Sequence, residues 1–146
     1  MPGVVLRLIG MLVALLITTA GTFAMGNQDR VELPIKQPEE IIRAEILKYT
    51  PLGSSPEAVL TFINSRLAHG HSHAEPYYDT KNGVQVPQPK GWPTVIGKRS
   101  ISLLVRTYGR SLRTIFTVYT GVYAYWAFDE RDSLIDVIVI KEQDGP

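Results

Sequence analysis

Hydrophobic residues follow three different patterns along the 146 residues of the chain. Residues 8–17 form an unbroken apolar run, apolar residues at helical spacing follow to about residue 68, and a period of two begins at Thr94. A continuous run indicates a leader or membrane segment, helical spacing indicates amphipathic helices, and alternation indicates strands. The pattern therefore predicts an apolar leader, then helices, then a sheet.

The apolar leader resembles a secretory signal peptide. Arg7 is the only charged residue before Asp29, and small residues follow the apolar run at 18–21. Cleavage after Ala20 or Ala24 would leave the mature domain in the periplasm or another extracytoplasmic space. The leader is the reason to place this protein in the envelope of a bacterial cell.

The alternative is that the leader stays attached as a membrane anchor at residues 4–25. The 18 uncharged residues 8–25 are just long enough to span a membrane as a helix. Threonines in this segment reduce its apolar character, so we expect cleavage. We assign residues 1–24 to a signal peptide or anchor and residues 25–37 to a linker.

Two short helices are predicted next. The first begins at Pro38, with Glu39 and Glu40 opposing the positive end of the helix dipole, and ends before Pro51. The second is expected at about 56–68, because a capping serine and a proline precede a single apolar stripe. This stripe consists of Val59, Phe62, Ile63 and Leu67.

The remaining chain predicts strands that follow one another through turns. We expect a strand at 101–108, a turn at Gly109 and Arg110, a long alternation over 116–128 and a closing strand at 134–141. One face of the alternation holds Phe116, Val118, Val122, Ala124, Trp126 and Phe128, and the other holds Thr117, Tyr119, Gly121, Tyr123 and Tyr125. The unbroken phase favours one strand with a bend or bulge at Gly121 over two strands joined there.

These elements predict a single α+β domain over residues 38–146. Two helices would pack on one face of an antiparallel sheet of three to four strands, preceded by the N-terminal hydrophobic helix. Residues 69–93, rich in proline, are expected to form an irregular loop. Within this loop Trp92 either pins the loop to the body or is an exposed contact.

The composition of the chain excludes several classes of function but does not assign one. The chain has no cysteine, so disulfides, a thiol nucleophile and a lipid anchor on cysteine are all excluded. The part after the leader has no net charge, which does not favour nucleic-acid binding. No serine-nucleophile or phosphate-binding motif is present, and we expect no enzyme and no cofactor.

Charge is nevertheless unevenly distributed. Residues 80–128 contain no acidic residue but seven basic ones, Lys81, Lys90, Lys98, Arg99, Arg106, Arg110 and Arg113. One interpretation is a basic face for an anionic lipid or an acidic partner. The interpretation we favour is that neighbouring acidic segments neutralise it in the fold.

Two groups of residues are candidates for a site. His69, His71 and His73 alternate, so three imidazoles of an extended segment could converge on a metal, although a solvated tract is the more common outcome. The second candidate is a binding surface on the sheet, formed by Tyr119, Tyr123, Tyr125, Arg106 and Arg110. Tyrosine also suits any half-exposed strand, so the aromatic row alone does not prove a site.

Short motifs of the domain resemble a known family. Residues 52–59 (LGSSPEAV), together with 125–129 (YWAFD) and 134–137 (LIDV), are similar to the SmpA/OmlA (BamE-like) small outer-membrane lipoproteins and the related β-lactamase-inhibitor-protein-like fold. The resemblance implies a two-layer fold used for protein contacts at the cell envelope, and it transfers no catalytic residue. The lipidated cysteine of that family is absent, and the loop at 69–93 is not expected from it.

The sequence therefore predicts an exported, non-catalytic protein of the bacterial envelope that binds another envelope protein. One alternative is an exported metal-binding protein that uses the three histidines. Another is a single-pass membrane protein with an extracytoplasmic domain, in which case membrane contact comes from the retained leader.

Overall fold

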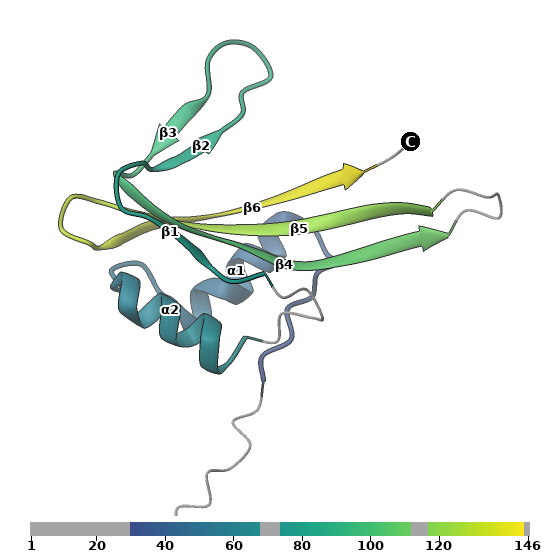
Figure 1. The fold of residues 1–146 in the computed structure, drawn as a ribbon, viewed down its shortest axis with the longest axis horizontal. Helices are drawn as coiled ribbons and strands as arrows, with labels where there is room; N and C mark the ends of the chain where they lie inside the picture. The colour runs from purple at the N-terminus through teal and green to yellow at the C-terminus, as the bar shows by residue number, and fades with distance from the viewer. Residues whose placement is uncertain (1–29, 68–73, 112–116, 145–146) are drawn as a thin grey trace, which may run out of the picture.

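The computed structural model describes residues 30–67, 74–111 and 117–144. The predicted leader and the three histidines lie outside these residues. The described chain is an α+β fold with two helices, a four-stranded antiparallel sheet and a separate two-stranded sheet (Figure 1). The elements are α1 (Glu39–Tyr49), α2 (Pro56–Ser65), β1 (Tyr77–Asp79), β2 (Val84–Val86), β3 (Thr94–Ile96), β4 (Arg99–Ser111), β5 (Thr117–Phe128) and β6 (Leu134–Asp144).

Both helices begin where the sequence predicts. Pro38 precedes α1, whose first turn carries two glutamates and whose last turn carries Lys48, so charges oppose both ends of the helix dipole. The hydroxyl of Ser55 accepts a hydrogen bond from the backbone N–H of Ala58 and caps α2. The second helix ends at Ser65, three residues before the predicted end.

The early end of α2 reflects a contact with the segment that precedes α1. Val31 and Leu67 form a parallel bridge, and the backbone N–H of Val31 donates to the carbonyl of Arg66 at 2.7 Å. Val31 and Leu33 are both buried in the core. The last part of the predicted linker is therefore packed against the domain.

The main sheet has the strand order β1-β4-β5-β6. The three long strands β4, β5 and β6 pair with one another antiparallel in chain order, and β1 adds three residues beside Ser100 to Ser102 of β4. The predicted turn at Gly109 and Arg110 is wrong, because β4 continues through both residues in register with Tyr119 and Val118. Residues 74–93 also differ from the expected irregular loop, since they contain β1 and β2.

The long alternation forms one strand, β5, as predicted. Gly121 stays in register with Thr107 and Glu142, so the expected bulge is not at this glycine. The register instead shifts between Leu104 and Arg106 of β4 and near Phe128 of β5. A shift changes which face the following residues share, and this matters for the candidate site below.

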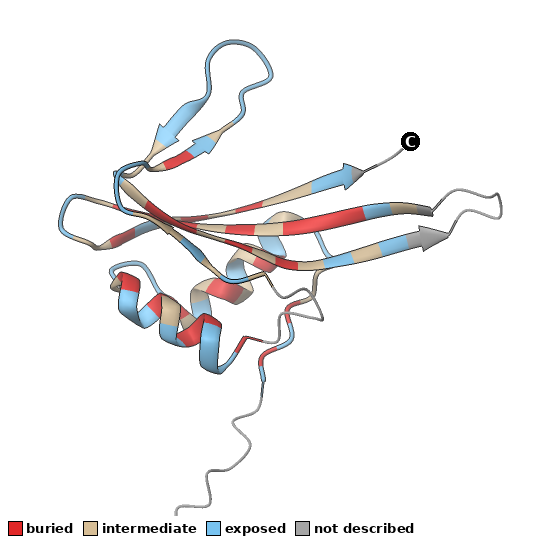
Figure 2. Cartoon of the chain, in the orientation of Figure 1, coloured by how far each residue is buried: buried red, intermediate tan, exposed pale blue. Residues whose placement is uncertain are grey.

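The core lies between the helices and one face of the sheet (Figure 2). Trp126 and Phe128 of β5 are fully buried there with Ile42 and Ile46 of α1. The indole N–H of Trp126 donates at 3.0 Å to the hydroxyl of Thr50, a buried residue directly after α1. This bond satisfies the one polar atom of the largest core side chain.

The two outer edges of the main sheet differ in how far their backbone groups are hydrogen-bonded. Along β6, Arg43 of α1 donates to the carbonyl of Val137 at 2.8 Å, and Glu39 accepts from the backbone N–H of Lys141 at 3.0 Å. Side chains of α1 therefore occupy backbone groups that an added strand would need. On the opposite side, no described strand pairs with β4 beyond Ser102.

The β2–β3 hairpin rises from the sheet on the side opposite the helices (Figure 1). Gly97, at φ +78°, passes so close to β5 that a Cβ there would lie 2.7 Å from the carbonyl oxygen of Phe128. Beside it, the backbone N–H of Lys98 donates to the same carbonyl at 2.7 Å. The base of the hairpin is thus fixed to the end of β5.

Candidate functional site

The face of the main sheet that the helices leave uncovered is the candidate binding surface (Figure 1). Residues opposite one another in an antiparallel pair share a face, so the register identifies its members. We call this surface the open face and use the name for these residues: Tyr77, Ser102, Leu104, Thr107, Gly109, Tyr119, Gly121, Tyr123, Tyr125, Ile138, Ile140 and Glu142. It contains all three tyrosines that the sequence proposed.

Tyr119, Tyr123 and Tyr125 share one face of β5 because they lie an even number of residues apart along the strand. The rings of Tyr123 and Tyr125 stack with centroids 6.5 Å apart and an interplanar angle of 25°. Gly121 provides the space beside them, because a Cβ at this position would lie 2.9 Å from the ring of Tyr123. Tyr119 is 53% exposed, whereas the stacked pair is half-buried.

Aliphatic side chains surround the stacked pair. Tyr125 lies opposite Ile138, and Tyr123 lies between Leu104 and Ile140 in register. The pKa of Tyr125 is raised mainly by burial among these neighbours and, to a smaller extent, by the nearby Glu142 carboxylate. The centre of the open face is therefore aromatic, aliphatic and partly dehydrated, which suits contact with another macromolecule.

The charge on this face differs from the sequence prediction. Arg106 is in register with Val122, which is buried under the helices, because the shift after Leu104 moves it out of the tyrosine set. Arg110 is in register with Val118. Of the described positions that share the open face, none is lysine or arginine, and the exposed Glu142 makes its charge acidic.

Two basic side chains of the stretch 80–128, one arginine and one lysine, have acidic partners, as the favoured interpretation of the sequence predicted. Arg99 forms an ion pair with Asp132, and the Lys98 ammonium lies 3.9 Å from the Glu130 carboxylate. Both acidic partners come from the turn between β5 and β6. The hydrogen bond from Arg99 to Asp132 raises the pKa of the guanidinium further.

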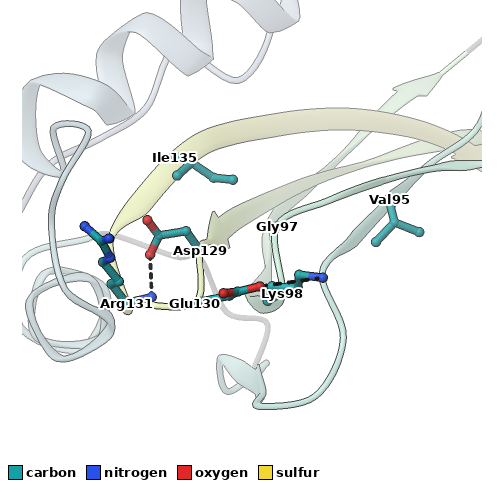
Figure 3. A pocket seen from close by; sticks show the side chains of 7 residues that line it. All are labelled: Val95, Gly97, Lys98, Asp129, Glu130, Arg131 and Ile135. Carbon is teal, nitrogen blue, oxygen red and sulfur yellow. Dashed lines mark hydrogen bonds and ion pairs between the residues drawn. The ribbon is translucent and has the colours of Figure 1, made fainter.

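A pocket lies between the hairpin base and this turn (Figure 3). It has a volume of about 510 Å³ and is lined by Val95, Gly97, Lys98, Asp129, Glu130, Arg131 and Ile135. The Asp129 carboxylate accepts from the backbone N–H groups of Arg131 at 2.8 Å and Ser133 at 2.9 Å. These bonds hold the pKa of Asp129 below its ordinary value and tie the carboxylate to the turn.

The predicted metal ligands His69, His71 and His73 lie outside the described residues. Among the residues that are described, no group of three or more histidine, cysteine, aspartate or glutamate side chains is arranged to hold a metal ion. Within the same part of the chain, neither helix is long and apolar enough to cross a bilayer.

In comparisons with known proteins, no family model, no curated protein and no solved structure matches the chain.

Proposed function

We propose that this chain is an exported, non-catalytic protein-binding module of the bacterial cell envelope, and that its open face binds another envelope protein. The observation that carries the proposal is the stacked Tyr123–Tyr125 pair among Leu104, Ile138 and Ile140. The leader supports export, and the resemblance to small envelope lipoproteins agrees with a role in protein contacts.

The chemistry of the open face favours a protein as the ligand. Tyrosine combines a large apolar ring with a hydroxyl and has few rotatable bonds, so it binds at a small entropic cost. Such residues are enriched at the centres of protein interfaces, where they supply most of the affinity. A stacked pair is already ordered before a partner arrives, which lowers the cost of binding further.

Charge indicates what kind of protein would fit. Because the described positions of the open face include no lysine or arginine, two copies meeting through their open faces would bring Glu142 and its counterpart together without a basic partner from that face. A partner with an apolar patch beside lysine or arginine would complement the same face. We therefore propose a different protein with a basic, apolar surface as the partner.

Site-specific crosslinking in the native host tests this surface. A photoreactive amino acid at Tyr119, on the open face, is expected to give one discrete adduct larger than the chain. The same group at the exposed Glu32, beside the covered part of the domain, should not give this adduct. An adduct at twice the mass of the chain would indicate self-association and contradict the proposal.

The partner identified in the adduct can then be purified and its affinity measured by calorimetry. Y123S/Y125S should weaken binding at least about tenfold, and E142K should weaken it about fivefold through charge. E32K is the matched control and should bind like the unchanged chain. Retention of full affinity by a folded Y123S/Y125S variant would show that the open face is not the site.

The fate of the leader is tested separately. We propose that its apolar run forms a hydrophobic helix that is cleaved during export, leaving the domain periplasmic or otherwise extracytoplasmic. Mass spectrometry of the native protein should then find an N-terminus after Ala20 or Ala24. An intact leader in the membrane fraction would support the anchored alternative, and an intact chain in the cytosol would contradict export.

A further inference from the structure

The tip of the β2–β3 hairpin is an apolar and basic projection that the proposed function does not use. Residues 87–95 are all exposed, and their apolar members are Pro87, Pro89, Trp92, Pro93 and Val95. Trp92 is 92% exposed, whereas Trp126, the other tryptophan, is fully buried. A Cβ added at Gly91, next to Trp92, would have no atom within 4 Å, so the tip stands away from the body.

The hairpin base holds this tip in a fixed direction. Val84 is buried, and the hydroxyl of Ser100 donates to the carbonyl of Asn82 at 2.9 Å. At the other strand, Lys98 donates its backbone N–H to Phe128, as described above. Three prolines between the strands restrict the backbone of the tip. The backbone that carries Trp92 is therefore already restricted, so binding through Trp92 should cost little further conformational entropy.

The charge of the hairpin is entirely basic. No acidic residue occurs between Asp79 and Asp129, and the hairpin carries Lys81, Lys90 and Lys98. Lys98 is the one of the three with an ion pair among the described residues, at a loose 3.9 Å. Lys90, two residues from Trp92, forms no ion pair within the described chain. Tryptophan and lysine together suit the headgroup region of a membrane with anionic lipid.

We propose that the hairpin tip binds a bilayer containing anionic phospholipid, with Trp92 inserted among the headgroups and Lys90 at the phosphate surface. The shape of the tip favours a lipid surface over a protein, because a convex projection needs no matching pocket in a fluid interface. The proposal is independent of the open face and of whether the leader is cleaved.

Tryptophan fluorescence of the full chain, purified with its native N-terminus, tests the proposal directly. Since the chain has two tryptophans, subtracting the spectrum of W92F leaves the emission of Trp92. Vesicles of phosphatidylcholine with phosphatidylglycerol should shift this emission to the blue and protect it from acrylamide, while vesicles of phosphatidylcholine alone should do so weakly. This readout reports Trp92 even if the leader also binds lipid.

Charge variants test the role of the lysine. K90Q should weaken the vesicle affinity measured by the Trp92 shift about fivefold. K36Q, a matched change at an exposed lysine beside α1, should not alter it. An unchanged Trp92 emission with both vesicle types overturns the proposal, as does an equal response to both. A shift produced by the purified protein partner but not by vesicles would assign the tip to that partner instead.

Discussion

The two faces of β5 differ in what they contribute, although their residues alternate along one strand. On the covered face, Trp126 has no exposed surface and donates its indole N–H to Thr50. On the open face, Tyr125 is half-buried and stacks on Tyr123. The covered face stabilises the fold, and the open face leaves aromatic surface for contact. Substitutions should separate these two contributions cleanly.

The largest expected effect is on the covered face. Trp126→Ala should lower the free energy of unfolding by about 3–5 kcal/mol, because it removes a large buried side chain and leaves a cavity. Trp92→Ala is the matched control and should change stability by less than about 0.5 kcal/mol. Chemical denaturation followed by circular dichroism measures both. Equal losses would contradict the burial described for these two residues.

A smaller loss of stability is expected from changing Thr50, whose hydroxyl accepts the hydrogen bond from the Trp126 indole. Thr50→Val should cost about 1–3 kcal/mol in the free energy of unfolding, since it leaves the Trp126 N–H buried without an acceptor. Thr61→Val, at an exposed hydroxyl of α2 that donates to the carbonyl of Glu57, is the control and should cost less. The comparison uses the same denaturation measurement, and a reversed order would show that the buried hydrogen bond contributes little.

The open face should tolerate change better than the covered one. Tyr123→Ser together with Tyr125→Ser should lower the free energy of unfolding by about 1–2 kcal/mol, in the range of lost cross-strand contacts. The same pair should lose partner binding, as proposed above. If unfolding became easier by as much as in Trp126→Ala, the tyrosines would be structural core residues and the contrast between the faces would disappear.

The smallest effect concerns the turn that joins β5 to β6. Backbone hydrogen bonds from Ser133 and Arg131 lower the pKa of Asp129 in the folded state. Its stabilising contribution is therefore present at neutral pH and is lost as the pH falls below about 4, where the unfolded chain takes up the proton first. Asp129→Asn should flatten the acid part of a stability–pH profile measured by thermal unfolding. An unchanged profile would show that this turn is not pH-sensitive.

The parts of the fold that the sequence predicted are those encoded by local signals. The proline, acidic residues and serine cap at the helix starts lie within a few residues of the elements they define. The alternation of β5 predicted that Tyr119, Tyr123 and Tyr125 share one face, and this prediction needed no information on which strands lie beside β5. Both kinds of signal are short-range, so a single sequence contains them.

The parts that were missed depend on distant residues. β1 and β2 have three residues each, too few to show a period, and β1 exists because it pairs with Ser100–Ser102. Gly109 suggested a turn, but pairing with Tyr119 keeps it in the strand. The register shift that moves Arg106 away from the tyrosines has no sequence signature at all. The acidic character of the open face was therefore not predictable.

The unequal edges of the main sheet limit how this protein can assemble by strand addition. Arg43 and Glu39 occupy two backbone groups of β6, which disfavours strand addition at this edge relative to the described part of β4 beyond Ser102. Two molecules joined at β4 would each present the β6 edge of the main sheet outward, and addition through this sheet is expected to stop at a pair. Replacing either side chain of α1 would remove that stop and open a route to longer polymers.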